Sequence, residues 1–283
     1  MTHFDSRGAA HSEYQSWGDL LRQCEQQGKF RGSSDERGAH RTSWTGTDSM
    51  AHALKLAREG WPEGEAKVSA LAKRLEQALV HGIVREEQNY DVEGMTFDTA
   101  RYLEGEPECW VKIEESTSEG PHRNLCIMLN VAASAGVSAR VLEARGAATA
   151  ALVSLLEYAG TRVEVWVACA WGNGTPSFTW KAKVKAYDQP IEPSRLAFAL
   201  VSPSICRRFS FRLAEQLPQS LQHKAGYDNG YGQPQRYPHI PKDALYIDKA
   251  HLYESQWSST EGALAWIKEK LKEQGVRLSE DRA

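Results

Sequence analysis

Two apolar runs separated by a small-residue loop and a long helix form the clearest pattern in the chain. The first run, Leu125–Leu129, ends in the loop Asn130–Gly136, and the second run is Val163–Ala168. Between them, Glu143–Ala159 has the length and apolar content of a buried helix that stops before Gly160. This order predicts an α/β sheet whose loop lies at the carboxyl end of the first strand, where open sheets bind ligands.

The residues after the second run predict that the sheet continues. Phe178–Ala186 alternates Trp180, Ala182 and Val184 with three lysines, the period-two pattern of a half-buried strand. The short turn before it predicts an antiparallel edge strand with its lysine face toward water. Later patterns predict helices at 193–200 and 205–216, a Gly/Tyr/Gln/Pro loop at 218–242, a strand at 245–247, and a last helix opened by a capping box at 258–261.

The N-terminal part of the chain favours helices over strands. Residues 1–45 are polar and irregular, except for a helical pattern at 17–27 that places Trp17, Leu20, Leu21 and Cys24 on one face. Residues 46–118 hold helical patterns at 50–59 and 65–80, a short helix near 97–103 and a strand at 110–114. Residues 119–283 hold the α/β pattern. The predicted fold class is therefore α/β, with a Rossmann-like, mostly parallel sheet, an antiparallel edge strand and a helical N-terminal region.

Composition narrows the class of protein. Of 283 residues, 41% are hydrophobic and 25% charged, and the formal net charge is -3, which gives no general attraction to nucleic acid. No apolar window reaches the length of a membrane span and the start lacks a signal-peptide core, so we expect a cytoplasmic protein without membrane contact. The five cysteines are widely spaced, which favours buried, reduced thiols.

The element order over about Leu125–Leu278 resembles the von Willebrand factor A-like domain, a Rossmann-type fold. That order is strand, helix, strand, hairpin strand, helices, strand and helix. Two phrases, Trp44–Ser49 with Gly60–Gly64 and Tyr102–Glu108, are similar to uncharacterised proteins of phages and mobile elements. This second resemblance implies no known activity. It implies that the protein is part of a phage or mobile-element assembly and is located in the host cytoplasm.

The first resemblance implies a place for a divalent cation at the strand tips. Von Willebrand A-like domains often bind one through an Asp-x-Ser-x-Ser loop, a Thr and a second Asp, because hard cations need oxygen ligands. Here Asn130 stands for the first Asp, Ala132 stands for the first Ser, and Ser134 is retained. The remaining candidate ligands are Ser202 or Ser204 and Asp248. The lost carboxylate and hydroxyl predict a degenerate site, so we expect no Mg²⁺ and no other cofactor.

Other catalytic motifs are not found in the sequence. The small residues 132–136 before a helix would suit a phosphate, but the glycine patterns of nucleotide-binding loops do not occur, which favours a tight packing turn. The histidines match no zinc-protease or nucleophile-elbow pattern. Paired-carboxylate catalysis by the acidic residues between 91 and 108 would need two groups a few ångströms apart, and a solvated or interaction surface is the alternative.

A row of lysines leaves nucleic-acid binding open. Lys181, Lys183 and Lys185 lie near Arg207 and Arg208 in chain order, and the loop 218–242 carries tyrosines. Single-stranded nucleic acid needs cations for its backbone and rings for its bases. Lysines on an edge strand also protect a sheet against aggregation, so both interpretations stand.

These patterns together predict a non-enzymatic protein–protein interaction module. The residues expected to face the partner are Asn130, Ser134, Asp248, Tyr227 and Tyr231. The alternative is an accessory protein that binds single-stranded DNA or RNA through the lysine row. A third hypothesis is a metal-assisted hydrolase or nuclease at the strand tips.

Overall fold

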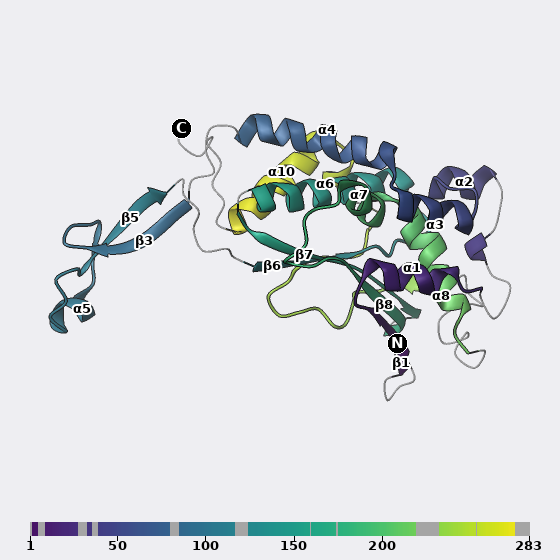
Figure 1. The fold of residues 1–283 in the computed structure, drawn as a ribbon, viewed down its shortest axis with the longest axis horizontal. Helices are drawn as coiled ribbons and strands as arrows, with labels where there is room; N and C mark the ends of the chain where they lie inside the picture. The colour runs from purple at the N-terminus through teal and green to yellow at the C-terminus, as the bar shows by residue number, and fades with distance from the viewer. Residues whose placement is uncertain are drawn as a thin grey trace.

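A large sheet lies at the centre of the protein (Figure 1). The computed structural model describes residues 2–4, 9–27, 33–35, 39–79, 85–116, 124–158, 160–173, 175–218, 232–252 and 254–274. The strands of this sheet are β1 (Thr2–Phe4), β2 (Ala10–Tyr14), β6 (Asn124–Asn130), β7 (Arg162–Asn173), β8 (Thr175–Lys185), β9 (Gln233–Pro234) and β10 (Leu245–Ile247). Their order is β1–β2–β8–β7–β6–β10, and the short β9 pairs with β7 outside this order.

The strand pairings confirm the α/β fold class. β6 pairs in parallel with β7 on one side and with β10 on the other, and β8 runs antiparallel to β7. This is a Rossmann-like sheet with parallel strands and an antiparallel partner, as the sequence predicts. β8 is not an edge strand, however, because β2 pairs with it in parallel, and β1 takes the edge position, antiparallel to β2.

The position of β2 is the main difference from the sequence prediction. We predicted a polar, irregular segment for residues 1–45 apart from a helix at 17–27, but β2 joins the large sheet. The predicted helix is confirmed as α1 (Trp17–Glu25), which packs Trp17 against Phe198 and Phe209 of the core. The buried residues of β2 are Ala10, Ser12 and Tyr14, which are too small or too polar to give an apolar pattern. The division of the chain at residues 45 and 118 stays a prediction.

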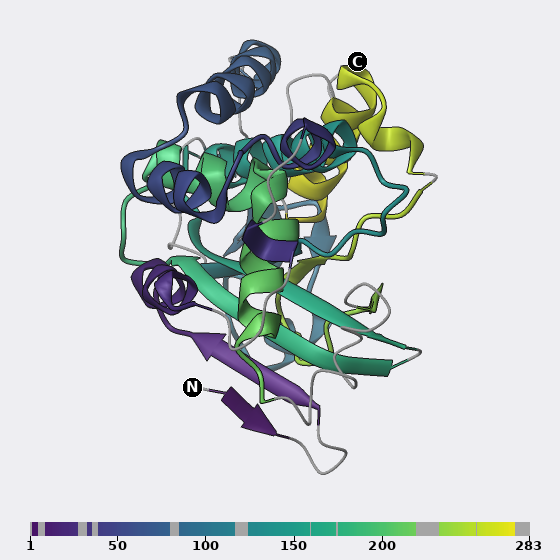
Figure 2. The same cartoon turned by 90° about the vertical axis from the view of Figure 1, so that its right-hand side faces the viewer.

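Helices cover one face of the sheet (Figures 1 and 2). They include α3 (Met50–Glu59), α4 (Pro62–Leu79), α6 (Ala139–Tyr158), α7 (Pro193–Val201), α8 (Ser210–Glu215) and α10 (Thr260–Glu273); α2 spans Ala39–Thr45, and a π-helical segment, Ile205–Phe209, precedes α8. α6 is buried on most sides, because it packs against β7, α4, α7 and α10. At Gly146 it approaches the Leu200 carbonyl of α7 so closely that a Cβ atom would clash. No helix in the described part of the chain is long and apolar enough to cross a bilayer.

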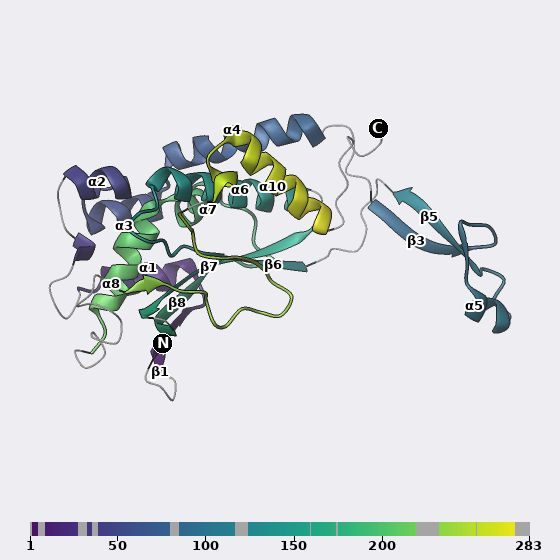
Figure 3. The same ribbon diagram turned by 180° about the vertical axis from the view of Figure 1, so that it is seen from behind.

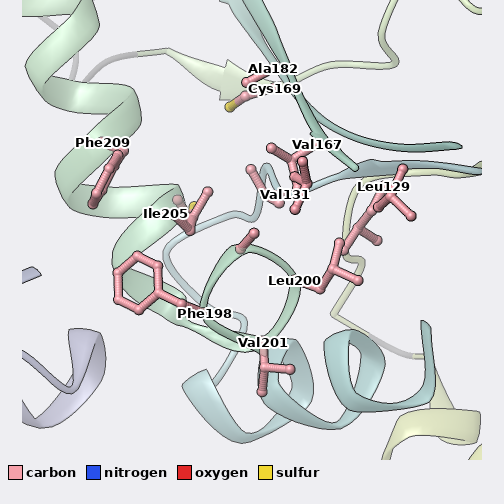
Figure 4. Packing of buried hydrophobic residues seen from close by; sticks show 14 of the residues in the cluster. Leu129, Val131, Val167, Cys169, Ala182, Phe198, Leu200, Val201, Ile205 and Phe209 are labelled. Carbon is pink, nitrogen blue, oxygen red and sulfur yellow. The ribbon is translucent and has the colours of Figure 1, made fainter. Parts of the chain in front are cut away.

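The main core lies between these helices and the sheet. Figure 4 shows the residues that meet there: Phe198, Leu200 and Val201 of α7, Ile205 and Phe209 of the π-helical segment, and Leu129, Val131, Val167, Cys169 and Ala182 from the sheet and the loop after β6. All five cysteines are buried free thiols, as predicted. Burial raises the pKa of the Cys126 thiol to about 11, so it stays protonated at neutral pH.

The opposite face of the sheet has no helical layer over the described residues. A smaller cluster lies there, in which Cys126, Met128 and Trp166 of the strands meet Tyr237 and Tyr246. The cover comes from the extended segment that leads to β10, which Figure 3 shows beneath the sheet. The chain therefore crosses this second face before it forms β10, which pairs with β6.

Residues 85–116 form a second, small sheet, which we call the arm. Its strands are β3 (Arg85–Asp91), β4 (Thr96–Phe97) and β5 (Trp110–Ser116), in the order β3–β5–β4, and α5 (Thr99–Leu103) lies between β4 and β5 in the chain. Figures 1 and 3 show the arm standing apart from the large sheet. The short helix and the strand β5 were predicted; β3 was not, because its sequence is polar throughout.

Candidate functional site

The carboxyl ends of β6 and β10 lie next to each other and carry the predicted strand-tip site. The segments after both strands stay side by side, since Ala250 N donates to Ala132 O at 3.0 Å. Leu252 reaches over the loop after β6: a Cβ atom at Gly136 would lie 2.7 Å from its side chain. We call the accessible residues of this region, Ser134, Arg236, Asp248 and Leu252, the strand-tip face.

Asn130 lies beneath this face and is fully buried. Its Nδ2 donates to the Gln235 carbonyl at 2.9 Å and to the Tyr246 hydroxyl at 3.0 Å, and its Oδ1 accepts from Ala132 N at 3.1 Å. Both the nitrogen and the oxygen of the side-chain amide are hydrogen-bonded, and the amide joins β6 to the segment that crosses the second face of the sheet. Asn130 was predicted to face a partner; the structure places it as an internal support instead.

Tyr246 connects Asn130 to Asp248. Its hydroxyl donates to Asp248 Oδ1 at 2.9 Å and accepts from Tyr237 N at 2.9 Å. Burial raises the pKa of this hydroxyl above its usual range, and the neighbouring Asp248 carboxylate acts in the same direction, so the hydroxyl remains a donor. Asp248 Oδ1 also accepts from Lys249 N, at 2.7 Å. Both oxygens of Asp248 are engaged, because Arg236 Nη1 lies 3.3 Å from Oδ2.

A buried arginine of α6 ties the two strand ends together. Arg145 is 2% exposed; its Nη2 donates to the Asn130 carbonyl at 2.8 Å, and its Nη1 donates to the Asp248 carbonyl. Burial lowers the pKa of this guanidinium to about 10, so it is still charged at neutral pH. The sequence analysis missed Arg145. The feature of the sequence that could have revealed it is a cation directly before the uncharged run Gly146–Leu156 of a predicted buried helix.

The predicted metal ligands do not form a cation site. Ser134 is half-buried in the loop after β6, while Ser202 ends α7, where its Oγ accepts from Ser204 N at 3.3 Å. The Asp248 carboxylate oxygens already contact donors of the protein, and the guanidinium of Arg145 places a positive charge next to the carbonyl oxygens of both strand ends. These residues do not fit Mg²⁺, which needs several free oxygen ligands. The described residues contain no group of three or more His, Cys, Asp or Glu side chains placed to hold a metal.

The predicted lysine row is paired with carboxylates. Lys181 Nζ lies 3.1 Å from Glu13, Lys183 Nζ lies 3.0 Å from Glu164, and Lys185 Nζ lies 2.6 Å from Glu157. The side chain of Lys185 is 4% exposed, so this lysine does not face water as we predicted. Lys181 and Lys183 also lie over the ring of Trp166, at 4.7 and 5.0 Å from its centroid. Lys181 and Lys183 therefore cover an aromatic ring of the second face.

Arg207 and Arg208 lie on the other side of the sheet. Trp180, next to Lys181, donates to Ser210 Oγ in the helical layer, and neighbouring strand residues point to opposite faces, so Lys181 and Lys183 point away from both arginines. Lys185 is paired with Glu157 of α6 instead. Arg208 is fully buried and donates to Thr47 and Ser34. The Arg207 guanidinium lies 4.5 Å from the centroid of Trp44. The structure therefore does not bring these five cations together on one surface.

Two further predicted partner residues, Tyr227 and Tyr231, lie outside the described residues. The strand-tip face also contains two side chains that the sequence analysis did not single out. Leu252 is 55% exposed, and the side chain of Arg236 is 63% exposed beside Asp248. Neither belongs to a motif; both are recognised only when the chain segments 134–136, 236 and 248–252 are brought together.

Comparison with known proteins gives a family. No curated protein and no solved structure matches the chain. Residues 6–277 match a family described as a domain of unknown function, DUF7192. This match extends from the residues just before β2, through the arm and the strand-tip face, to the end of α10. The chain therefore belongs to the DUF7192 family.

Proposed function

We propose that the protein is a protein–protein interaction module that presents the strand-tip face to a protein partner. The observation that carries this proposal is Leu252, a large apolar side chain exposed over the loop after β6, at the same edge of the sheet as the Arg236–Asp248 ion pair. An apolar anchor within a polar rim is the usual composition of a protein-binding surface.

The hydrogen bonds beneath the face support a binding role. Asn130, Tyr246 and Arg145 fix the backbone on which Asp248 and Leu252 stand. A surface that is already ordered loses less conformational entropy when a partner binds. The polar groups at the strand tips are thus used to shape the face, which fits recognition better than acid–base or metal chemistry.

The resemblance to the von Willebrand factor A-like domain stays part of this proposal. The element order on which it rests runs from β6 through α6, β7, β8, α7, α8 and β10 to α10. This order supports a shared fold and a shared use of the strand tips. An assembly of a phage or mobile element, located in a host cytoplasm, stays a prediction from the second resemblance.

Affinity capture with matched variants tests the proposal. The tagged protein and its Leu252→Ser variant are used to capture partners from the native cell, with and without nuclease, and the captured proteins are quantified by mass spectrometry. We expect a nuclease-resistant partner whose yield falls at least fivefold in the variant, because loss of an anchor side chain costs more than about 1 kcal/mol.

Tyr158→Ser is the control for this experiment. Tyr158 is 83% exposed at the other end of α6, about 30 Å along the helix from its start, so its loss should leave capture unchanged. Equal capture by wild type and Leu252→Ser would contradict the strand-tip proposal. Partners that disappear with nuclease would favour the nucleic-acid alternative, and the lysine triple variant Lys181/Lys183/Lys185→Ala would then be the next test.

A further inference from the structure

The arm is strongly acidic compared with the rest of the chain. Its basic residues are Arg85, Arg101 and Lys112. Against these three stand ten acidic residues: Glu86, Glu87, Asp91, Glu93, Asp98, Glu104, Glu106, Glu108, Glu114 and Glu115. The arm thus has a formal charge of -7, and since the whole chain carries -3, the remainder carries +4.

Large apolar side chains are exposed on the same unit. Six of the eight exposed large hydrophobic residues of the described chain lie in the arm, and the other two are Leu252 and Tyr158. Met95 and Leu103 are the most open of the six, at 80% and 78% exposed. The remaining four are Tyr90, Val92, Phe97 and Tyr102. Such a concentration of apolar surface in about thirty residues marks an interaction site.

The exposed side chains stand on an ordered framework. Phe97 lies between Tyr102 and Trp110, with ring centroids 5.2 and 5.0 Å apart. Asp98 caps α5 by accepting from Ala100 N at 3.0 Å and Arg101 N at 3.2 Å. The three strands form a single layer, and α5 has no buried residue. A sheet of this size ordinarily packs against a further layer.

From these features we infer that the arm is a docking element for a basic protein surface that also exposes apolar side chains. The negative charge selects a cationic partner, and the side chains Met95, Tyr102 and Leu103 supply the apolar contact. The charge excludes nucleic acid and anionic membrane as occupants, because both would be repelled. This inference does not rest on the strand-tip proposal, since it concerns a different surface, and either can fail alone.

A defined peptide probe tests the inference on the full-length protein. The probe is a fluorescein-labelled amphipathic helix of lysine and leucine, titrated with protein and followed by fluorescence anisotropy at low and physiological salt. We expect the Met95→Ser/Leu103→Ser double variant to bind it at least tenfold more weakly, and Tyr158→Ser to bind as wild type. Glu104→Gln/Glu108→Gln should weaken binding mainly at low salt, because exposed charges are screened.

Two further peptides and one measurement on the protein alone complete the test. A lysine–serine peptide of the same charge and a glutamate–leucine peptide of opposite charge should both bind at least tenfold more weakly than the lysine–leucine probe. The inference is overturned if the double variant binds the probe as wild type does, or if either control peptide binds equally well. A dimer in sedimentation equilibrium that disappears in the double variant would overturn the separate partner and assign the arm to a second copy of this chain.

Discussion

Replacing Arg145 tests whether the buried guanidinium holds the strand ends together. Arg145→Met keeps much of the length of the side chain but removes the donors to the Asn130 and Asp248 carbonyls. A hydrogen bond from a charged donor contributes about 1.5–3 kcal/mol, and an orphaned buried carbonyl costs a similar amount. Part of this loss is offset, because methionine is buried without the cost of desolvating a charge. We therefore expect the free energy of unfolding to fall by about 2–4 kcal/mol.

Urea denaturation followed by circular dichroism measures this change, with the m-value as a check on two-state unfolding. Arg140→Met is the matched control, since Arg140 lies on the same helix but is exposed, and a surface substitution changes stability by only about 0.5 kcal/mol. Equal midpoints and m-values for the two variants would show that the guanidinium does not support the strand tips. In that case the ordered state of the strand-tip face would need another explanation.

Three further predictions concern the packing of α6, the lysine row and the arm. Gly146→Ala should lower the free energy of unfolding by about 1–3 kcal/mol, because the added methyl meets a backbone carbonyl of α7. The control is Gly18→Ala in α1, whose methyl would lie 3.4 Å from the end of the Arg22 side chain and 3.8 Å from the Ser16 hydroxyl; it should be neutral or stabilising in the same urea assay. Lys185→Met should cost about 1–3 kcal/mol, since it removes the cation beside Glu157 and the donor to the carbonyls of Val163 and Ala186. Lys181→Met should cost less than about 1 kcal/mol because its ion pair is more exposed; equal losses in thermal or urea unfolding would contradict this. The backbone hydrogen bond from Arg101 N and the other donors lower the pKa of Asp98 below 3.8. The contribution of Asp98 to the order of α5 is therefore present above pH 3.8 and is lost as the pH falls through the lowered value. Amide exchange in the arm that does not rise at acid pH would refute this.

The sequence predicted the elements whose pattern is set by their own burial. β6, α6 and β7 were found within a few residues, because apolar strands and an apolar helix of this kind are stable only in the interior of the protein. β2 and β3 were missed, since polar strands are defined by their neighbours: β2 by β8, which lies far along the chain, and β3 by β5. No local pattern contains that information.

The candidate site was predicted in position but not in composition. The strand tips are where the sequence placed them, yet Asn130 points inward and Leu252 faces outward. A spacing pattern gives the face of a strand or helix, but the burial of one residue depends on which loops cross it. The same limit explains Lys185. The alternation of β8 predicts that the lysines share a face, but the burial of Lys185 follows from its ion pair with Glu157 of α6.

The pairing of β2 with β8 has a consequence for how the protein is made. His11 bonds to Thr179, 168 residues later, so the N-terminal strand leaves the ribosome long before its partner exists. At about 5–20 residues per second this interval lasts roughly 10–30 s. During translation the backbone groups of β2 that later pair with β8 are available to other strands, including those of neighbouring nascent chains, and the sheet closes only when β8 emerges. Folding in the cell is thus expected to be late and sensitive to chaperones that shield β2.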